Sequence, residues 1–154
     1  MTPCLWFDHQ AEEAVDFYLS VFQENSQVLA VSRYTEAGPG PAGTVLTLRF
    51  LLCGQEMMAL NGGPLFRFNE ALSLVVNCED QKEMDYYWDQ LGEGGEPGPC
   101  GWLKDKYGLS WQIVPKAFEA WMDPADPERN TRVMRALLQM GKLELAALTK
   151  AAEG

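Results

Sequence analysis

The stretch Glu12-Glu13-Ala14-Val15-Asp16-Phe17-Tyr18 is echoed later in the chain by Lys82-Glu83-Met84-Asp85-Tyr86-Tyr87-Trp88. Both stretches place acidic residues ahead of an aromatic pair, and in the first the apolar residues recur at helical spacing. Short apolar runs that are typical of strands follow each stretch. The repetition predicts two copies of one unit, which together form a pocket rather than a solenoid.

The same order of elements is expected in both halves. In the first half the patterns predict a strand, a helix and three strands, at 4–7, 11–22, 28–34, 44–52 and 56–60. In the second half they predict a strand at 71–77, a helix at 81–91 with Glu79 or Asp80 as its cap, an extended segment at 99–104 and a strand at 109–114. The fold class that follows is α+β.

The domain organisation predicted from these patterns is one paired domain at 1–115, with modules at 1–64 and 65–115, and a helical extension at 116–154. Within the extension, Asp126-Pro127 is a helix start. Its apolar stripe, which includes Val133, Leu137 and Leu148, packs on its own sheet or on a second subunit. The sequence leaves these two alternatives open.

Charge and composition restrict the class of partner. The 154 residues carry a formal net charge of −10, and no basic stripe is present that would bind a phosphate backbone. We therefore expect no nucleic-acid partner. No apolar run is long enough to span a bilayer, and Asp8 and Glu12 stand where a secretory leader would be basic and then apolar. These features predict a cytoplasmic protein without a membrane partner.

The four cysteines are irregularly spaced, without a C-x-x-C pair, and His9 is the single imidazole of the chain. A zinc site of the usual Cys/His kind is therefore not supported. Cys100 lies in a Gly/Pro-rich turn and is a candidate nucleophile if Lys104 or Lys106 comes close enough to favour its thiolate.

Three segments, at 11–18, 59–64 and above all 100–112, resemble the PhnB-like branch of the vicinal oxygen chelate superfamily, which includes glyoxalase I, bleomycin-resistance proteins and extradiol dioxygenases. The resemblance covers nearly the whole chain. It implies two βαβββ modules whose sheets curve around a shared cleft, usually in a dimer, so we expect a homodimer. Members of this branch are often labelled as a 3-demethylubiquinone-9 3-methyltransferase domain.

The cofactors that the resemblance suggests find little support in the residues. Neither expected helix follows the glycine-rich turn that would hold S-adenosylmethionine. The positions that similar enzymes use for a divalent metal correspond here to Pro3, Met58 (with Ala59 as the neighbouring register), Ser73 and Gln112. Pro and Met cannot bind a hard cation, and Ser and Gln are weak neutral donors. We therefore predict neither a metal nor a cofactor.

The residues expected to line the cleft are aromatic and polar. Trp102 and Trp111 offer flat apolar walls for a planar ligand, with ordinary core packing as the alternative. Gln112, Ser73 and Asn61 offer hydrogen-bonding groups, although Asn61 also suits a left-handed turn.

Two functional hypotheses follow. The first is a metal-free protein that binds a small, partly aromatic molecule whose identity the sequence does not reveal. The second is a metal-independent enzyme that uses Cys100, Glu70 or Gln112 in the same cleft, with Glu70 as a base if burial raises its pKa. An ionisable group buried inside the cleft with a shifted pKa favours the enzyme, whereas walls and shape alone favour the binding protein.

Overall fold

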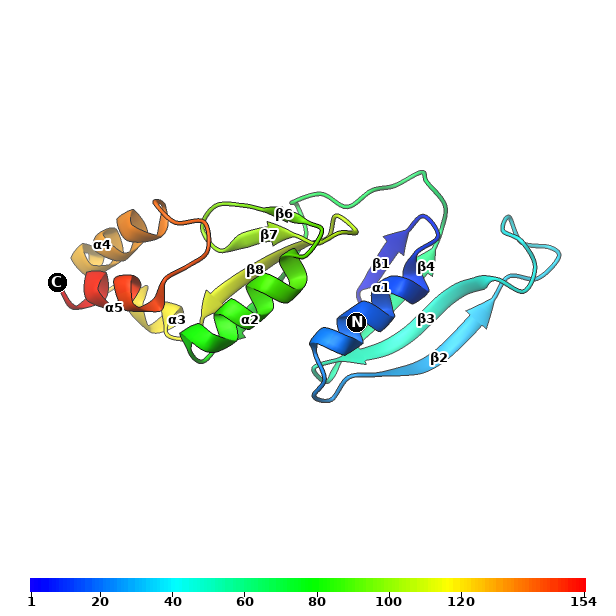
Figure 1. Cartoon of the computed structure of the whole chain (residues 1–154), viewed down its shortest axis with the longest axis horizontal. Coiled ribbons are helices and arrows are strands. Elements are labelled where there is room, and N and C mark those ends of the chain that lie inside the picture. The colour runs from blue at the N-terminus through cyan, green and yellow to red at the C-terminus, as the bar shows by residue number, and fades with distance from the viewer. The chain divides into compact units, whose positions relative to one another are not determined.

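A computed structural model describes all 154 residues, Met1–Gly154. The chain divides into two compact units, Met1–Phe68 and Asn69–Gly154 (Figure 1). No helix of the chain is both long enough and apolar enough to cross a bilayer.

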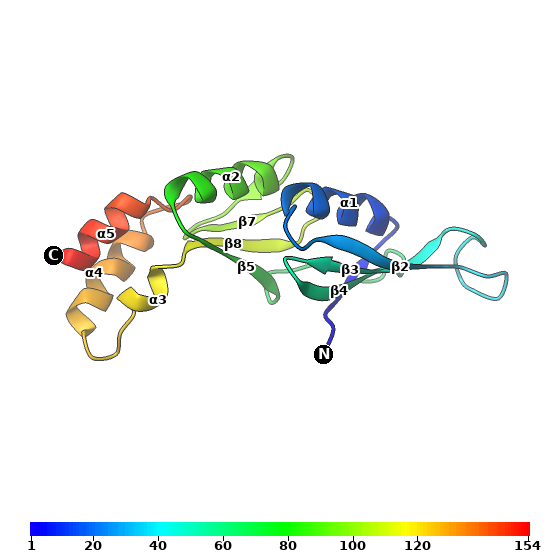
Figure 2. The ribbon, with the colours of Figure 1, turned by 90° about the horizontal axis from the view of Figure 1, so that it is seen from below.

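The first unit is one four-stranded mixed sheet with a helix. Its elements are β1 (Cys4–Phe7), α1 (Ala11–Val21), β2 (Gln27–Arg33), β3 (Val45–Leu52) and β4 (Gln55–Asn61). The strand order is β1-β4-β3-β2, with β1 parallel to β4 and the other neighbours antiparallel. Helix α1 lies along one face of this sheet (Figure 2).

The hydrophobic core of the first unit lies between α1 and the sheet. Along β3 and β4, buried residues recur mostly at every second position, as a strand with one covered face requires. Each large apolar side chain that becomes buried contributes about 1.5–3 kcal/mol. The side chains that form this core include Leu5, Phe7, Ala14, Val15, Tyr18, Leu48, Phe50, Met57 and Ala59.

The second unit repeats the order and adds three helices. Its module comprises β5 (Ser73–Cys78), α2 (Gln81–Gly92), β6 (Glu96–Pro97), β7 (Trp102–Lys104) and β8 (Ser110–Pro115), in the sheet order β5-β8-β7-β6. The helices α3 (Phe118–Trp121), α4 (Pro127–Leu137) and α5 (Leu145–Glu153) follow. The α+β class with two βαβββ modules is thereby confirmed, as two separate four-stranded sheets that do not close. The short strand β6 and helix α3 were not predicted.

Helix α2 begins with a reciprocal cap. The Asp80 side chain accepts a hydrogen bond from the Glu83 backbone N–H at 2.8 Å, and the Glu83 carboxylate accepts one from the Glu79 N–H at 2.6 Å. Asp80 is thus the cap, and Glu79 is the residue before it. Such caps typically stabilise a helix by about 1 kcal/mol.

The turn between β7 and β8 is organised by a buried carboxylate. Asp105 is 3% exposed; its Oδ1 accepts hydrogen bonds from the backbone N–H groups of Tyr107 (2.9 Å) and Leu109 (3.1 Å), and its Oδ2 accepts one from the Trp111 indole (2.8 Å). Three donors compensate for the loss of hydration that burial of the charge entails. The carboxylate therefore fixes both the turn and the orientation of Trp111.

The C-terminal helices pack on their own unit. Four residues of the predicted apolar stripe are buried: Val133, Leu137, Leu143 and Leu148. The segment after α4 is also tied to the β6–β7 connection, because the N–H groups of Cys100 and Gly101 donate to the carbonyls of Met140 and Gly141, both at 2.7 Å. The stripe is covered largely by packing of α4 against α5 rather than on the sheet, and packing on a second subunit stays a prediction.

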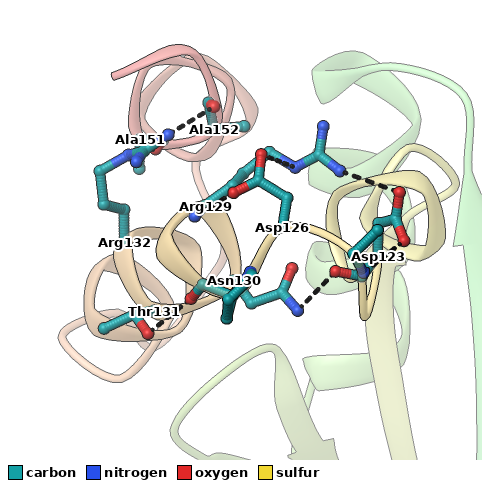
Figure 3. A network of polar contacts seen from close by, with 10 residues as sticks. Asp123, Asp126, Arg129, Asn130, Thr131, Arg132, Ala151 and Ala152 are labelled. Carbon is teal, nitrogen blue, oxygen red and sulfur yellow. Dashed lines mark hydrogen bonds and ion pairs between the residues drawn. The ribbon is translucent and has the colours of Figure 1, made fainter.

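Polar contacts fix the ends of these helices (Figure 3). Asp126 caps α4 by accepting from the Arg129 N–H at 3.0 Å, and Asn130 Nδ2 donates to the Asp123 carbonyl at 2.9 Å. From α4, the Arg132 guanidinium donates to the carbonyls of Ala151 and Ala152 at 2.9 and 3.1 Å. A cation at these last carbonyls also complements the negative end of the α5 dipole.

Asp105→Ala is expected to lower the free energy of unfolding of the second unit by about 3 kcal/mol, because three donors lose a charged acceptor in the interior. Urea unfolding followed by tryptophan fluorescence measures the change. The control is Asp89→Ala on the exposed surface of α2, which should stay within about 0.5 kcal/mol of the wild type. Equal stabilities for the two variants would contradict the role assigned to Asp105.

Gly101→Ala tests the close approach of the C-terminal segment. Gly101 has φ +82°, and a Cβ there would lie 2.8 Å from the Ile113 carbonyl oxygen and 3.0 Å from the Leu143 side chain. Gly108 has φ +86° but no atom within 4 Å of such a Cβ. Gly108→Ala should cost about 1–2 kcal/mol for the left-handed backbone alone. Gly101→Ala should cost about 2 kcal/mol more in the same thermal unfolding assay, and an equal loss would exclude the steric contact.

Candidate functional site

The second unit contains a cleft of about 460 Å³, within the size range of small-molecule sites. It is formed by β6, β7, the loop between them, the start of β8 and a residue that precedes β5. Its walls are mostly apolar. The lining residues are Glu70, Glu96, Pro97, Gly98, Pro99, Cys100, Trp102, Leu103, Lys104 and Ser110.

Strand register determines which side chains share a face of this sheet. Lys104 on β7 pairs with Ser110 on β8, and Trp102 pairs with Gln112, so these four side chains lie on one face. Leu103 and the other alternate residues lie on the opposite face, which α2 covers (Figure 2). The polar and aromatic side chains of the cleft are thus on the face away from α2.

The two tryptophans proposed as cleft walls lie on different faces. Trp102 is half-buried and lines the cleft. Trp111 pairs with Leu103, so it faces α2; it is 1% exposed and donates its indole N–H to Asp105. Trp111 therefore belongs to the core. Core packing was the alternative to a cleft wall that the sequence left open for both tryptophans.

Gln112 and Ser73 contact each other. The Gln112 side-chain amide donates to the Ser73 hydroxyl at 2.9 Å, across the neighbouring strands β8 and β5. Both residues are half-buried and on the same face as Trp102, beside the residues that line the cleft. Neither residue lines the cleft itself, and their mutual hydrogen bond occupies the Gln112 amide nitrogen.

Asn61 has a structural position in the first unit. It is 9% exposed, its Oδ1 accepts from the Ala11 N–H at 2.8 Å, and its Nδ2 donates to the Val45 carbonyl at 3.1 Å. It is the last residue of β4 and does not have the positive φ of a left-handed turn. Asn61 thus joins the start of α1 to β3, and both of its side-chain polar atoms are occupied.

Ser110 was not identified from the sequence. It lines the cleft, is 1% exposed, and its hydroxyl has no hydrogen-bond partner. A buried hydroxyl without a partner is unfavourable, and such groups are uncommon in folded proteins. In the sequence Ser110 is only a polar residue at the start of an apolar run. Strand ends commonly show this pattern, so it does not mark a ligand site. Its register opposite Lys104 is what brings it to the cleft.

Glu70 is exposed and paired, in contrast to the buried base that the enzyme hypothesis needs. Its side chain is 62% exposed, and its carboxylate lies 2.5 Å from the Lys104 ammonium. The hydrogen bond from Lys104 lowers the pKa of Glu70, and the same bond raises the pKa of Lys104. Glu70 is therefore ionised and a weak base at neutral pH.

Cys100 lines the cleft in a constrained backbone conformation. It has φ +58°, a value uncommon for a residue with a side chain. Its backbone N–H donates a hydrogen bond to the Met140 carbonyl. Lys104 points its ammonium at Glu70, and His9 belongs to the other unit. The Cys100 thiol makes no hydrogen bond with a base, although the carboxylates of Glu70 and Glu96 line the same cleft.

Comparison with known proteins identifies the family. A family model described as 3-demethylubiquinone-9 3-methyltransferase matches residues 1–114. The chain belongs to this family. Among proteins of curated function, none matches the chain at a significant level.

Solved structures share the fold of this chain. A Bacillus cereus protein named PhnB and 3-demethylubiquinone-9 3-methyltransferase is 39% identical, with a TM-score of 0.66 over 75% of this chain and 98% of that protein. Protein PA1353 of Pseudomonas aeruginosa is 19% identical, with a TM-score of 0.62 over 75% and 96%. The fosfomycin resistance protein FosX of Listeria monocytogenes, solved with Mn(II) and sulfate, is 16% identical, with a TM-score of 0.52 over 72% and 86%. The fold is that of the glyoxalase/bleomycin resistance superfamily.

The methyl donor that the family description implies does not fit this chain. S-adenosylmethionine is commonly held at a glycine-rich turn between a strand and a helix. Here β1 leads to α1 through residues 8–10 and β5 leads to α2 through residues 79–80, and neither connection contains glycine.

A divalent metal likewise lacks suitable ligands. Pro3 and Met58 are neighbours in the first unit, where the Met58 N–H donates to the Pro3 carbonyl at 2.9 Å, and Ser73 and Gln112 are neighbours in the second. The four positions thus form one adjacent pair in each unit, but none offers a carboxylate, imidazole or thiolate. No three His, Cys, Asp or Glu side chains gather as a metal site elsewhere in the chain. The absence of a bound metal stays a prediction.

The Glu70–Lys104 pair should make the folding stability of the second unit depend on pH. Because the pKa of Glu70 is lowered in the folded protein, the stabilisation is present above the ordinary glutamate pKa and is lost as pH falls through the lowered value. Carbon-detected NMR titration should find the Glu70 pKa below that of exposed glutamates. In Lys104→Gln it should return to the ordinary range. A Glu70 pKa above that range would instead support the base of the enzyme hypothesis.

Proposed function

We propose that this protein binds a small organic molecule in the cleft of its second unit, without a metal ion. The observation that carries the proposal is the cleft itself, whose walls are mostly apolar and which is bordered by Trp102 and the unpaired hydroxyl of Ser110. An apolar pocket with a few convergent polar groups is the usual form of a ligand site. A planar ligand on Trp102 would gain both buried area and ring contacts.

The geometry supports binding better than catalysis. Glu70 is exposed with a lowered pKa, and the Gln112 amide is engaged by Ser73. A metal-independent reaction at Cys100 is the second candidate, favoured by the left-handed backbone that holds this thiol at the cleft. Such a reaction needs a proton acceptor, and neither carboxylate of the cleft, Glu70 or Glu96, makes a hydrogen bond with the Cys100 thiol.

Metal-free binding is supported by the side chains at the four positions where similar enzymes hold a metal, here called the inherited positions: Pro3, Met58, Ser73 and Gln112. Pro and Met side chains do not ligate a hard cation, and the neutral oxygens of Ser and Gln bind one weakly. Methyl transfer is not proposed, because the chain has no turn suited to the methyl donor.

We place the protein in the cytoplasm as a homodimer. All four cysteines are free, which suits a reducing compartment. The dimer is inferred from the resemblance to a superfamily whose members usually pair. Light scattering coupled to gel filtration would report twice the 17.2 kDa chain mass for the dimer.

Trp102→Ala should weaken binding of an uncharged aromatic probe. N-phenyl-1-naphthylamine, which becomes fluorescent in apolar sites, is titrated into the full chain. Loss of the indole should reduce the binding free energy of the probe by about 1.4 kcal/mol or more, which corresponds to a tenfold or larger rise in Kd. Trp121→Ala is the matched control, because Trp121 is also half-buried but lies in α3 outside the cleft. Equal Kd values for the two variants, or no binding by the wild type, would refute the proposed cleft.

Metal dependence is tested with the same probe. Kd and the melting temperature should be unchanged after dialysis against EDTA and after addition of Mn(II), since the inherited positions carry no ionised ligand. Elemental analysis of protein purified without chelator should find no stoichiometric divalent metal. Stoichiometric metal, or a tighter Kd with Mn(II), would overturn the metal-free proposal.

A further inference from the structure

We infer that the cleft of the second unit selects flat organic cations over neutral and anionic molecules of the same shape, an inference that rests on the proposed function. It follows from three features of the lining: an excess of carboxylate, an aromatic wall and a buried hydroxyl without a partner.

The charge of the lining is negative. Glu70 and Glu96 supply two carboxylates and Lys104 one ammonium, so the cleft carries one net negative charge. The Lys104 ammonium is hydrogen-bonded to Glu70, and Glu96 acts on it only as a more distant charge. The Glu96 carboxylate is therefore left to attract a cationic ligand.

Glu96 is placed where a ligand on Trp102 could reach it. On β6 it pairs with Lys104 of β7, and Lys104 shares its face of the sheet with Trp102. Pro97 and Pro99, which follow Glu96 and also line the cleft, restrict the backbone of this wall. The carboxylate and the indole thus border one cleft and are held on neighbouring strands.

The aromatic wall favours the same ligand class. A cation over the face of an indole is attracted by the negative face of the ring, and tryptophan is the strongest of the aromatic side chains in this respect. A flat cation such as an N-alkylated heteroaromatic ring would combine stacking on Trp102 with attraction to Glu96. An anion of the same shape would meet the repulsion of Glu96 instead.

Ser110 is the second, independent sign that a ligand belongs in this cleft. Its hydroxyl is nine-tenths or more buried and has no hydrogen-bond partner, although it lies on the face of the lining. A ligand that carries a hydroxyl or ring N–H could supply the missing partner. The charge preference comes from Glu96, and a hydrogen bond with Ser110 would add affinity whatever the charge of the ligand.

The test uses three probes that differ mainly in charge: 1-methylquinolinium (cation), 1-methylnaphthalene (neutral) and 1-naphthoate (anion). Titration of the full chain at low ionic strength, followed by tryptophan fluorescence, gives three Kd values. We expect the cation to bind about fivefold or more tightly than the neutral probe, and the anion most weakly. The preference should shrink at about 0.5 M salt, because Glu96 is exposed and screened.

Glu96→Gln should remove most of the cation preference and leave the Kd of 1-methylnaphthalene unchanged. Glu93→Gln is the matched control: it removes the same charge from an exposed residue that lies just before β6 and does not line the cleft. If Glu93→Gln reduces the preference as much as Glu96→Gln, the attraction belongs to the acidic chain as a whole and the inference is wrong.

The outcomes distinguish cation selection from the proposed binding function on which it rests. Equal binding of the cationic and neutral probes, with both weakened by Trp102→Ala, would refute cation selection and leave the binding cleft intact. Tighter binding of the anion would refute it as well. If none of the probes binds to the wild type, the proposed function itself fails.

Discussion

The site in the second unit depends on the buried carboxylate of Asp105. By accepting two backbone N–H groups and the Trp111 indole, it holds the turn between β7 and β8 and fixes the register of the two strands. That register directs Trp111 into the core and brings Ser110 opposite Lys104. A shift of one residue would exchange the two faces, since side chains alternate along a strand. The chemistry of the cleft is therefore set by a hydrogen-bonded turn that is not itself part of the cleft.

The C-terminal segment also holds the loop between β6 and β7, which forms one wall of the cleft. The loop that carries Cys100 and Gly101 is held by the carbonyls of Met140 and Gly141, and the close approach at Gly101 leaves no space for a side chain. The helical extension buries its own apolar stripe and at the same time fixes one wall of the cleft. Because a loop of glycine and proline residues has little regular structure of its own, these hydrogen bonds define its path. The extension is thus part of the architecture that positions the site.

Much of the fold was predictable because local patterns in this chain are strong. Helical spacing of apolar residues located α1, and the repeat of its sequence together with a capping residue located α2, for which Asp80 was one of two caps proposed. The strand β6 was missed because its two residues lie in a Gly/Pro-rich stretch and are paired only through β7. The candidate site was harder to predict. Trp102 and Trp111 looked alike in sequence, and the residue count across a turn does not reveal which face each will occupy.

The sequence by itself determined the repeated βαβββ order, the α+β class and the lack of hard metal ligands at the inherited positions, because these depend on local spacing and residue type. The tertiary structure decided which polar groups find partners. Asn61 and Trp111 became structural through contacts with distant residues, Glu70 was held ionised by Lys104, and Ser110 was left unpaired. Hydrogen bonds between residues far apart in the chain require strand register and burial, and neither is encoded in any single segment.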